Sequence, residues 1–290
     1  MFFEIIKFIV YSGFIVLISK YILVTTLRKL AENLNLKPKV VGDIAGYATS
    51  MPELLTIGAS SFNGLISASV VNVFSSNVIN MIQYISSIIL NKNQKLLKNK
   101  AIKIDIILTL ITIIIPIILL ILKIEISLSI VPIFIILYLL FNYLNTNAHK
   151  LYLRKEDEVL EKQIEEEEKW EKNNKKKTIK YVIYLLITGV LLFIIGDALG
   201  NTLENLCNMF NISQTIIGIL LGFITSIPEL ITFFEAQKHY KKEKSKEILG
   251  VVEATNNMLT SNMLNLFIIQ SIGILIFEFF CINIVKLLDK

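Results

Sequence analysis

Two matching stretches decide the fold: Thr49-Ser50-Met51-Pro52-Glu53-Leu54 and Thr225-Ser226-Ile227-Pro228-Glu229-Leu230, 176 positions further along the chain (229 − 53). The likeness extends beyond the hexamers, because eight of 19 positions are identical when residues 38–56 are compared with residues 214–232. Both copies lie in otherwise apolar segments. The repeat predicts two related halves, each with a proline and a glutamate at the same place in a helix.

Each hexamer brings oxygen atoms together inside an apolar helix. An ionisable group within a membrane span costs about 2.5–3.5 kcal/mol and indicates a functional site. A proline removes a backbone donor and frees a carbonyl about one turn earlier, which protein, water or an ion must satisfy. Oxygen-only ligands suit hard cations such as Ca²⁺ and Na⁺. The alternative is a pair of proline kinks with paired or protonated glutamates, but kinks alone do not explain why the same neighbours recur.

The composition is that of a polytopic membrane protein, with 290 residues, 54% of them hydrophobic, and a mean hydropathy of +0.64. Only five prolines and 12 glycines interrupt the chain, so the spans are predicted to be helices rather than barrel strands. The net charge of +5 is typical of basic cytoplasmic loops and does not indicate nucleic-acid binding. Two cysteines and two histidines, none clustered, exclude a zinc, iron–sulfur or haem framework, and we expect no cofactor. No nucleophile–base pair suggests an enzyme.

Apolar segments predict eight spans, at residues 5–27, 39–62, 65–90, 104–122, 126–144, 179–206, 213–236 and 248–276. The hexamers lie in the motif helices 39–62 and 213–236. Each motif helix is followed by a partner helix rich in Ser and Asn, 65–90 and 248–276, in which a Ser and an Asn four positions apart share one face. The spans 104–122 and 126–144 are almost free of polar groups beyond Thr and Ser and are predicted to be scaffold.

Basic residues gather in the loops after spans 1, 3 and 7 and before span 6. Because cytoplasmic loops carry an excess of Lys and Arg, this pattern predicts that the N-terminus is outside. The two motif helices then have opposite orientations, which predicts an inverted repeat with its site near the midplane. The predicted units are a first repeat at 1–145, a charged cytoplasmic loop at 146–178 and a shortened second repeat at 179–290.

The partner helices carry a second repeated pattern, Val71-Asn72-Val73-Phe74-Ser75-Ser76-Asn77-Val78-Ile79-Asn80 and Asn256-Asn257-Met258-Leu259-Thr260-Ser261-Asn262-Met263-Leu264-Asn265. Together with the hexamers, this sequence resembles the cation/calcium exchanger superfamily, in its sodium/calcium exchanger branch. There a G…TSxPEL helix precedes a helix with GNxxGSNxxN or GSNxxD. The resemblance covers spans 1–3 and 6–8.

The resemblance implies an antiporter in the plasma membrane that exchanges Ca²⁺ for Na⁺ by alternating access. It implies that Glu53 and Glu229 are shared Ca²⁺ ligands. Hydroxyl and main-chain oxygens would come from Thr49, Ser50, Thr225 and Ser226. The remaining implied ligands are Ser76, Asn80, Ser261 and Asn265, with main-chain carbonyls of Gly46 and Gly222.

The chain departs from the family pattern in three ways. The glycines of the partner helices are replaced by Val71, Ser75, Asn256 and Thr260, which predicts looser packing there. Asn265 stands where several members have an aspartate. The family commonly has ten spans, and this chain ends after the eighth.

Two alternatives therefore stay open. One is an H⁺-coupled Ca²⁺ antiporter, although the GNxxE signature of that branch is missing. The other is a non-transporting cation-binding or accessory membrane protein, with a partner subunit or a second copy of the chain. A further carboxylate, Glu253, is predicted to lie at the pore mouth or to pair with a loop lysine.

Overall fold

The computed structural model describes residues 2–34, 36–62, 66–122, 127–152, 175–210, 213–240 and 247–282, which form helices joined by short turns and contain no strand. The helices of the first half are α1 (Phe2–Ile18), α2 (Thr25–Leu34), α3 (Pro38–Thr49), α4 (Met51–Phe62), α5 (Ile66–Leu90), α6 (Lys100–Ile121) and α7 (Val131–Tyr152). Those of the second half are α9 (Lys175–Phe210), α10 (Gln214–Thr225), α11 (Ile227–Tyr240), α12 (Glu247–Met263) and α13 (Gln270–Ile276). Short 3₁₀ turns occupy Gln94–Lys98 and Leu128–Ile130, and π-helical segments occupy Ser19–Val24, Leu264–Ile269 and Phe277–Ile282.

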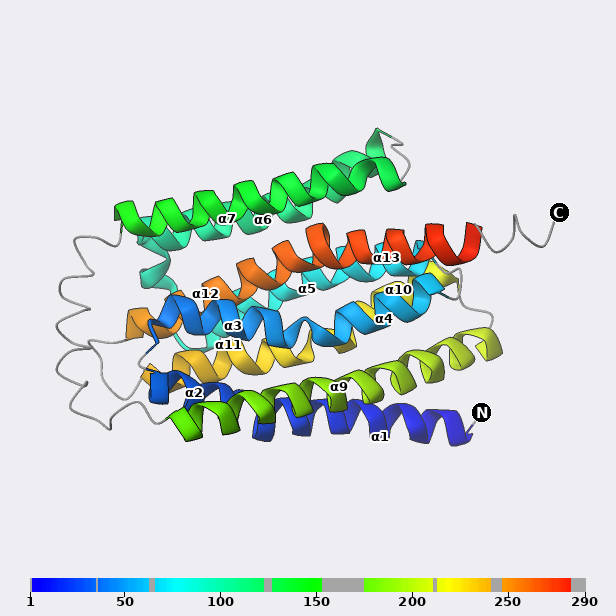
Figure 1. Ribbon diagram of the computed structural model, residues 1–290, viewed down its shortest axis with the longest axis horizontal. Coiled ribbons are helices and arrows are strands. Elements are labelled where there is room, and N and C mark those ends of the chain that lie inside the picture. The colour runs from blue at the N-terminus through cyan, green and yellow to red at the C-terminus, as the bar shows by residue number, and fades with distance from the viewer. Residues whose placement is uncertain are drawn as a thin grey trace.

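Six helical stretches in the described part of the chain are long and apolar enough to cross a membrane: Ile66–Leu90, Lys100–Leu119, Leu128–His149, Lys175–Thr202, Gly218–Tyr240 and Glu247–Phe279. They correspond to the last six predicted spans. The first predicted span continues from α1 through a π-helical segment into α2, and the second is divided into α3 and α4. In Figure 1, α3 and α4 together still run the length of the bundle. The prediction of an all-α polytopic membrane protein is confirmed.

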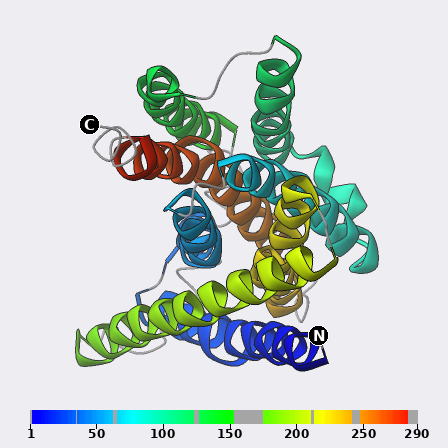
Figure 2. The same ribbon diagram turned by 90° about the vertical axis from the view of Figure 1, so that its right-hand side faces the viewer.

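The helices run side by side along the long axis of the molecule in three groups (Figure 1). Motif and partner helices form the centre, where α3 packs on α12 and α10 packs on α5. Seen along the axis in Figure 2, α1 and α9 cover one side of this centre and α6 and α7 cover the other. The pair α3–α4 and the pair α10–α11 run in opposite directions (Figure 1), which is the course expected of an inverted repeat.

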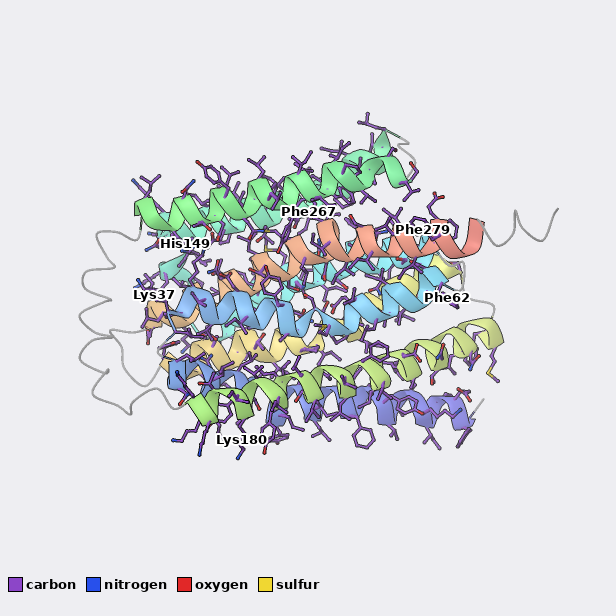
Figure 3. All side chains as sticks on the ribbon, in the orientation of Figure 1. Lys37, Phe62, His149, Lys180, Phe267 and Phe279 are labelled. Carbon is purple, nitrogen blue, oxygen red and sulfur yellow. The ribbon has the colours of Figure 1, made fainter. Side chains whose placement is uncertain are left out.

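One end of the bundle, here called the basic end, carries the predicted basic loops. Lys37 and Lys180 lie at this end, and Phe62 and Phe279 lie at the opposite end (Figure 3). Both ends of the predicted loop 146–178 are helical, because α7 continues to Tyr152 and α9 begins at Lys175. The part of this prediction on residues 153–174 lies outside the described residues.

The motif and partner helices cross closely because glycines line the motif side. A Cβ added to Gly46 would lie 2.9 Å from the Cβ of Thr260. A Cβ added to Gly218 would lie 2.8 Å from the Cβ of Val71. Such distances are shorter than real Cβ contacts, so only glycine fits. The prediction of looser packing is therefore wrong, since the glycines of α3 and α10 leave room for the larger side chains of α12 and α5.

Candidate ion-binding site

Each motif helix is broken two positions before its proline. Ser50 separates α3 from α4 with φ −81° and ψ 1°, and Ser226 separates α10 from α11 with φ −82° and ψ 1°. The near-identical dihedral angles show that the repeated hexamer folds the same way twice. A proline cannot donate to the preceding turn, which weakens the helix there. The residue directly before each proline, Met51 or Ile227, already belongs to the next helix.

The break places both glutamates at helix N-termini in the protein interior. Glu53 lies in the first turn of α4 and Glu229 in the first turn of α11. Unsatisfied backbone N–H groups give the first turn of a helix a partial positive charge, which stabilises a carboxylate there. Both side chains have no exposed surface, and no ion pair to either is found among the described residues.

The two carboxylates differ in their hydrogen bonds. Neither oxygen of Glu53 has a partner, whereas Glu229 Oε1 accepts a hydrogen bond of 3.0 Å from Ser261 Oγ and only Oε2 is unpartnered. Ser261 Oγ is also 2.8 Å from Ser50 Oγ. Burial of a charged oxygen without a partner is costly. The arrangement therefore favours a positive charge between the two glutamates.

Hydroxyl groups of each motif lie near the glutamate of the other motif. Thr225 and Ser226 lie near the carboxylate of Glu53, and Thr49 lies near that of Glu229, while Thr49 and Thr225 donate to main-chain carbonyls of their own helices. The hydroxyl of Ser226 is buried and has no hydrogen-bond partner. The site is thus made jointly by both halves of the chain, as the inverted repeat predicts.

The carbonyls of Gly46 and Gly222 and the hydroxyl of Ser76 form hydrogen bonds within the protein. The carbonyls of Gly46 and Gly222 each accept a hydrogen bond of 3.2 Å from the serine at the helix break. Ser76 Oγ lies 3.4 Å from the Gly222 carbonyl and 3.3 Å from Asn72 Oδ1. The first and second halves therefore meet at Gly222 as well as at the glutamates.

The two asparagines of the predicted set differ. Asn80 donates from Nδ2 to Ser261 Oγ at 3.3 Å and to Asn262 Oδ1 at 3.0 Å, while its own Oδ1 has no partner. Asn265 is buried in the π-helical segment Leu264–Ile269, and neither its amide oxygen nor its amide nitrogen has a partner. No hydrogen bond joins Asn265 to the other predicted ligands among the described residues.

A second set of symmetric hydrogen bonds, absent from the predicted site, supports the ligands. Asn72 Nδ2 donates to Thr56 Oγ1 at 3.0 Å, and Asn257 donates in the same way to Thr232. Each bond ties a partner helix to the motif helix of its own half. Thr56 and Thr232 are among the repeat identities, and Asn72 and Asn257 occupy matching places in the partner-helix repeat, so the internal repetition could have indicated these residues.

The buried atoms without a partner are nearly all oxygens. Among the predicted ligands they are Glu53 Oε1 and Oε2, Glu229 Oε2, Ser226 Oγ, Asn80 Oδ1 and both amide atoms of Asn265. No cluster of three or more His, Cys, Asp or Glu side chains occurs in the described part of the chain. Carboxylate, hydroxyl and amide oxygens without thiolate or imidazole fit a hard cation such as Ca²⁺ or Na⁺ and do not fit zinc.

Comparison with protein families agrees with a site for hard cations. The family model described as sodium/calcium exchanger protein matches residues 5–147 and 180–286. The chain belongs to this family. It is therefore a multi-pass membrane protein and a cation/Ca²⁺ antiporter, a transporter rather than an enzyme.

Solved structures of exchangers share the fold at low sequence identity. The sodium-calcium exchanger NCX_Mj soaked with 10 mM Na⁺ and zero Ca²⁺ is 20% identical, with a TM-score of 0.56 over 95% of this chain and 84% of that chain. NCX_Mj soaked with 100 mM Na⁺ and 10 mM Sr²⁺ is 19% identical, with a TM-score of 0.56 over 95% and 83%. The H⁺/Ca²⁺ exchanger CAX is 14% identical, with a TM-score of 0.64 over 96% and 69%. No curated protein matches the chain.

In this member of the exchanger family, Glu253 has a different partner from the one predicted. Arg28 of α2 donates from Nη1 to Glu253 Oε2 at 2.8 Å and from Nη2 to Oε1 at 2.7 Å. Both side chains are largely buried, at 15% and 5% exposure. The predicted pairing with a loop lysine is therefore wrong, because α2 brings an arginine fork against α12 and a lysine cannot match that two-point geometry.

A polar cluster at the edge of the scaffold was missed in the sequence. Asp105 of α6 is fully buried and accepts from Asn145 Nδ2 at 2.9 Å, with His149 Nε2 at 2.8 Å. Asn145 also lies 3.3 Å from Asn256 of α12. The spans predicted to be plain scaffold thus reach the partner helix of the second half through hydrogen bonds.

Proposed function

We propose that this chain exchanges Ca²⁺ for Na⁺ across the plasma membrane by alternating access. The observation that carries the proposal is the pair Glu53 and Glu229, both fully buried, with no ion pair among the described residues and with hydroxyl groups of the opposite motif nearby. Two carboxylates neutralise one Ca²⁺. Several Na⁺ ions can take its place but cannot bind together with it, and this mutual exclusion couples the two fluxes.

The proposed ligands come from three places: the two glutamates, other oxygens of the motif helices, and side chains of the partner helices. Glu53 and Glu229 bridge Ca²⁺. The main-chain carbonyls of Gly46 and Gly222 and the oxygens of the broken turns bind from the motif helices. The hydroxyl ligands of the motif helices are Thr49, Ser50, Thr225 and Ser226. The partner helices complete the shell with Ser76, Asn80, Ser261 and Asn265. No bound cofactor is needed.

Alternating access needs one part of the bundle to move against the other. We assign this movement to α1 and α9, because they pack on each other along one side of the bundle (Figure 2). The central helices that carry the ligands then stay together through their crossings, while the outer pair slides and opens the site to either side.

The deciding experiment is radioactive calcium uptake into proteoliposomes that are loaded with Na⁺ and diluted into Na⁺-free buffer. We expect uptake that requires the outward Na⁺ gradient and that Glu229→Gln abolishes. Glu235→Gln is the matched control, since Glu235 lies on the same helix, is 36% exposed and pairs only weakly with Lys238 at 3.7 Å. Uptake that persists in Glu229→Gln would contradict the assignment of the site.

Coupling to H⁺ is the second candidate, because Asn265 leaves the site with two carboxylates and neither oxygen of Glu53 has a partner. A carboxyl group in this position can exchange a proton for the ion. Calcium uptake that responds to an imposed pH gradient in Na⁺-free buffer, and that Glu53→Gln abolishes, would favour this candidate. Calcium binding in detergent with no uptake under either gradient would instead indicate a non-transporting binding protein.

A further inference from the structure

The helices α1, α2 and α9, with the π-helical segment between α1 and α2, are here called the α1–α9 group. This group meets the central helices through apolar side chains. One buried cluster contains residues from both sides of the interface: Ile15, Leu23, Leu27, Leu192 and Leu199 from the α1–α9 group, and Ala45 and Ile224 from the central helices. Apolar contacts have no preferred direction, so this interface allows the α1–α9 group to slide.

Arg28 and Glu253 form a contact of another kind at the basic end of this interface. Arg28 of α2 donates from Nη1 and Nη2 to the two carboxylate oxygens of Glu253 on α12, at 2.8 Å and 2.7 Å. Two parallel hydrogen bonds fix the angle of the guanidinium as well as its distance. The ring of Tyr240, at the end of α11, lies 5.8 Å from Arg28 Cζ, so two central helices contact this arginine. The pair therefore resists the sliding that the apolar cluster allows.

The pair lies between the ion site and the basic end. The helix α12 starts at the basic end (Figure 1), and Glu253 precedes the proposed ligand Ser261 by eight residues, which is about 12 Å along a helix. The helix α3 crosses α12 at the same level, because a Cβ on Gly42 would lie 2.9 Å from the Cβ of Asn256. Ser261 has no exposed surface, so the site is closed toward the basic end in this conformation.

We propose that Arg28 and Glu253 are a latch that keeps the basic end closed over the ion site and that opens when the α1–α9 group moves. This proposal rests on the exchange function proposed above. Both side chains are largely buried. Movement of α2 along α12 separates them, and a charge that stays buried without its partner is strongly unfavourable. The pair can therefore separate only when water enters between α2 and α12, which opens the basic end.

The experiment measures how fast a membrane-impermeant thiol reagent labels a cysteine in the interface from each side of the membrane. The reporter is Ala45→Cys in the full-length protein, with Cys207→Ser and Cys281→Ser to remove the two native cysteines. Ala45 is 2% exposed and lies in the apolar cluster, so a cysteine there reacts when the interface opens. Inverted membrane vesicles present the basic end, the predicted cytoplasmic side, to the reagent, and right-side-out vesicles present the opposite end.

The double variant Arg28→Gln with Glu253→Gln removes both charges and keeps polar side chains. We expect it to label about tenfold faster from the basic end, which corresponds to a shift of about 1.4 kcal/mol toward the open state, and no faster from the opposite end. Arg28→Lys keeps the charge without the two-point geometry, so we expect a smaller increase. This second variant also keeps the test valid if the double variant folds poorly.

The matched control is Lys7→Gln with Glu4→Gln, which removes an ion pair formed within α1. Its labelling is expected to equal that of the unmodified pair. Unchanged labelling in both latch variants would overturn the proposal. An equal increase from both ends would overturn it as well, because the pair would then only stabilise the fold.

Labelling needs no ion gradient, so the latch and the exchange function are tested separately. Calcium uptake driven by Na⁺ together with unchanged labelling would overturn the latch alone. Faster labelling from the basic end without uptake under a Na⁺ gradient would overturn Na⁺-driven exchange and support the latch.

Discussion

Asn77 and Asn262 each donate the side-chain amide to the main-chain carbonyl of the other, at 3.1 Å and 3.0 Å. This reciprocal pair joins the two partner helices at the centre of the bundle and relates the two halves of the chain. Both side chains are fully buried. The pair lies next to Ser76 and Ser261 in the sequence, so it fixes the point at which the oxygens from the two halves meet.

Removal of either asparagine is expected to lower stability, and removal of Asn262 is expected to cost more. Asn77→Ala removes one buried hydrogen bond, worth about 0.5–1.5 kcal/mol, whereas Asn262→Ala also removes the acceptor of the Asn80 side chain. The double variant is expected to lose less than the sum, because the two bonds share one crossing. Thermal unfolding in detergent measures this. Asn142→Ala is the control, since Asn142 is exposed on α7 and bonds only its own helix. If the stability loss of the double variant equals the sum of the two single losses, the two hydrogen bonds act independently and the prediction is wrong.

The hexamers predict their own local structure well, because a proline and its neighbours act within one turn. Ser50 and Ser226 break their helices where the sequence indicates, with the glutamates just beyond. Asn77 could also have been singled out, since it has the same spacing to its counterpart Asn262 as Ser76 has to Ser261. Local rules and internal repetition therefore explain the part of the site that the sequence predicts.

The remaining contacts depend on which helices become neighbours. Arg28 and Glu253 are 225 positions apart, and no spacing rule connects them. Asp105 was overlooked because its span is otherwise apolar, although a buried carboxylate needs partners and finds one in His149. The close crossing of Gly46 with Thr260 was also missed, because one glycine on either helix is enough to let two helices approach.

The ion pair of Arg28 with Glu253 is expected to be far more sensitive to loss of one partner than to loss of both. Arg28→Met leaves a buried carboxylate uncompensated and is expected to cost about 3–5 kcal/mol. The double variant Arg28→Met with Glu253→Met places apolar side chains of similar size in contact and is expected to recover most of that loss. A double-mutant cycle of thermal unfolding in detergent measures the coupling. Lys7→Met is the control, because Lys7 contacts Glu4 and Phe3 of its own helix and is partly exposed. Equal loss in the single and double variants would contradict the expected recovery.

Two glycine-to-alanine changes are expected to have opposite signs. A Cβ at Gly222 would overlap Ser75 Oγ and lie 2.9 Å from the Ser76 main-chain nitrogen, so Gly222→Ala is expected to destabilise the protein by about 1–3 kcal/mol. Gly189 in α9 has nothing within 4 Å of an added Cβ. Gly189→Ala is expected to stabilise the protein by about 0.5–1 kcal/mol, because alanine has less conformational freedom than glycine in the unfolded chain. Thermal unfolding of both variants side by side is the measurement, and a destabilised Gly189→Ala would contradict the reasoning.

Ser261 and Ser76 occupy matching places in the two partner helices, yet their substitution is expected to differ. Ser261 Oγ contacts Glu229, Ser50 and Asn80, whereas Ser76 Oγ contacts only Asn72 and the Gly222 carbonyl. Under the proposed function, Ser261→Ala removes a hydrogen bond to a charged ligand, which is worth about 1.5–3 kcal/mol, or roughly a tenfold or larger loss of Ca²⁺ affinity.

Ser76→Ala removes neutral contacts at 3.3 and 3.4 Å and is expected to weaken Ca²⁺ binding severalfold less. Calcium titration of both purified variants in Na⁺-free detergent compares them directly. Ser129→Ala is the control, because Ser129 lies in the 3₁₀ turn before α7 and contacts only Ser127. Equal losses of Ca²⁺ affinity in Ser261→Ala and Ser76→Ala would contradict this prediction, because the two serines would then contribute equally once the ion is bound. The hydrogen bond to Glu229 would then belong to the ion-free site alone.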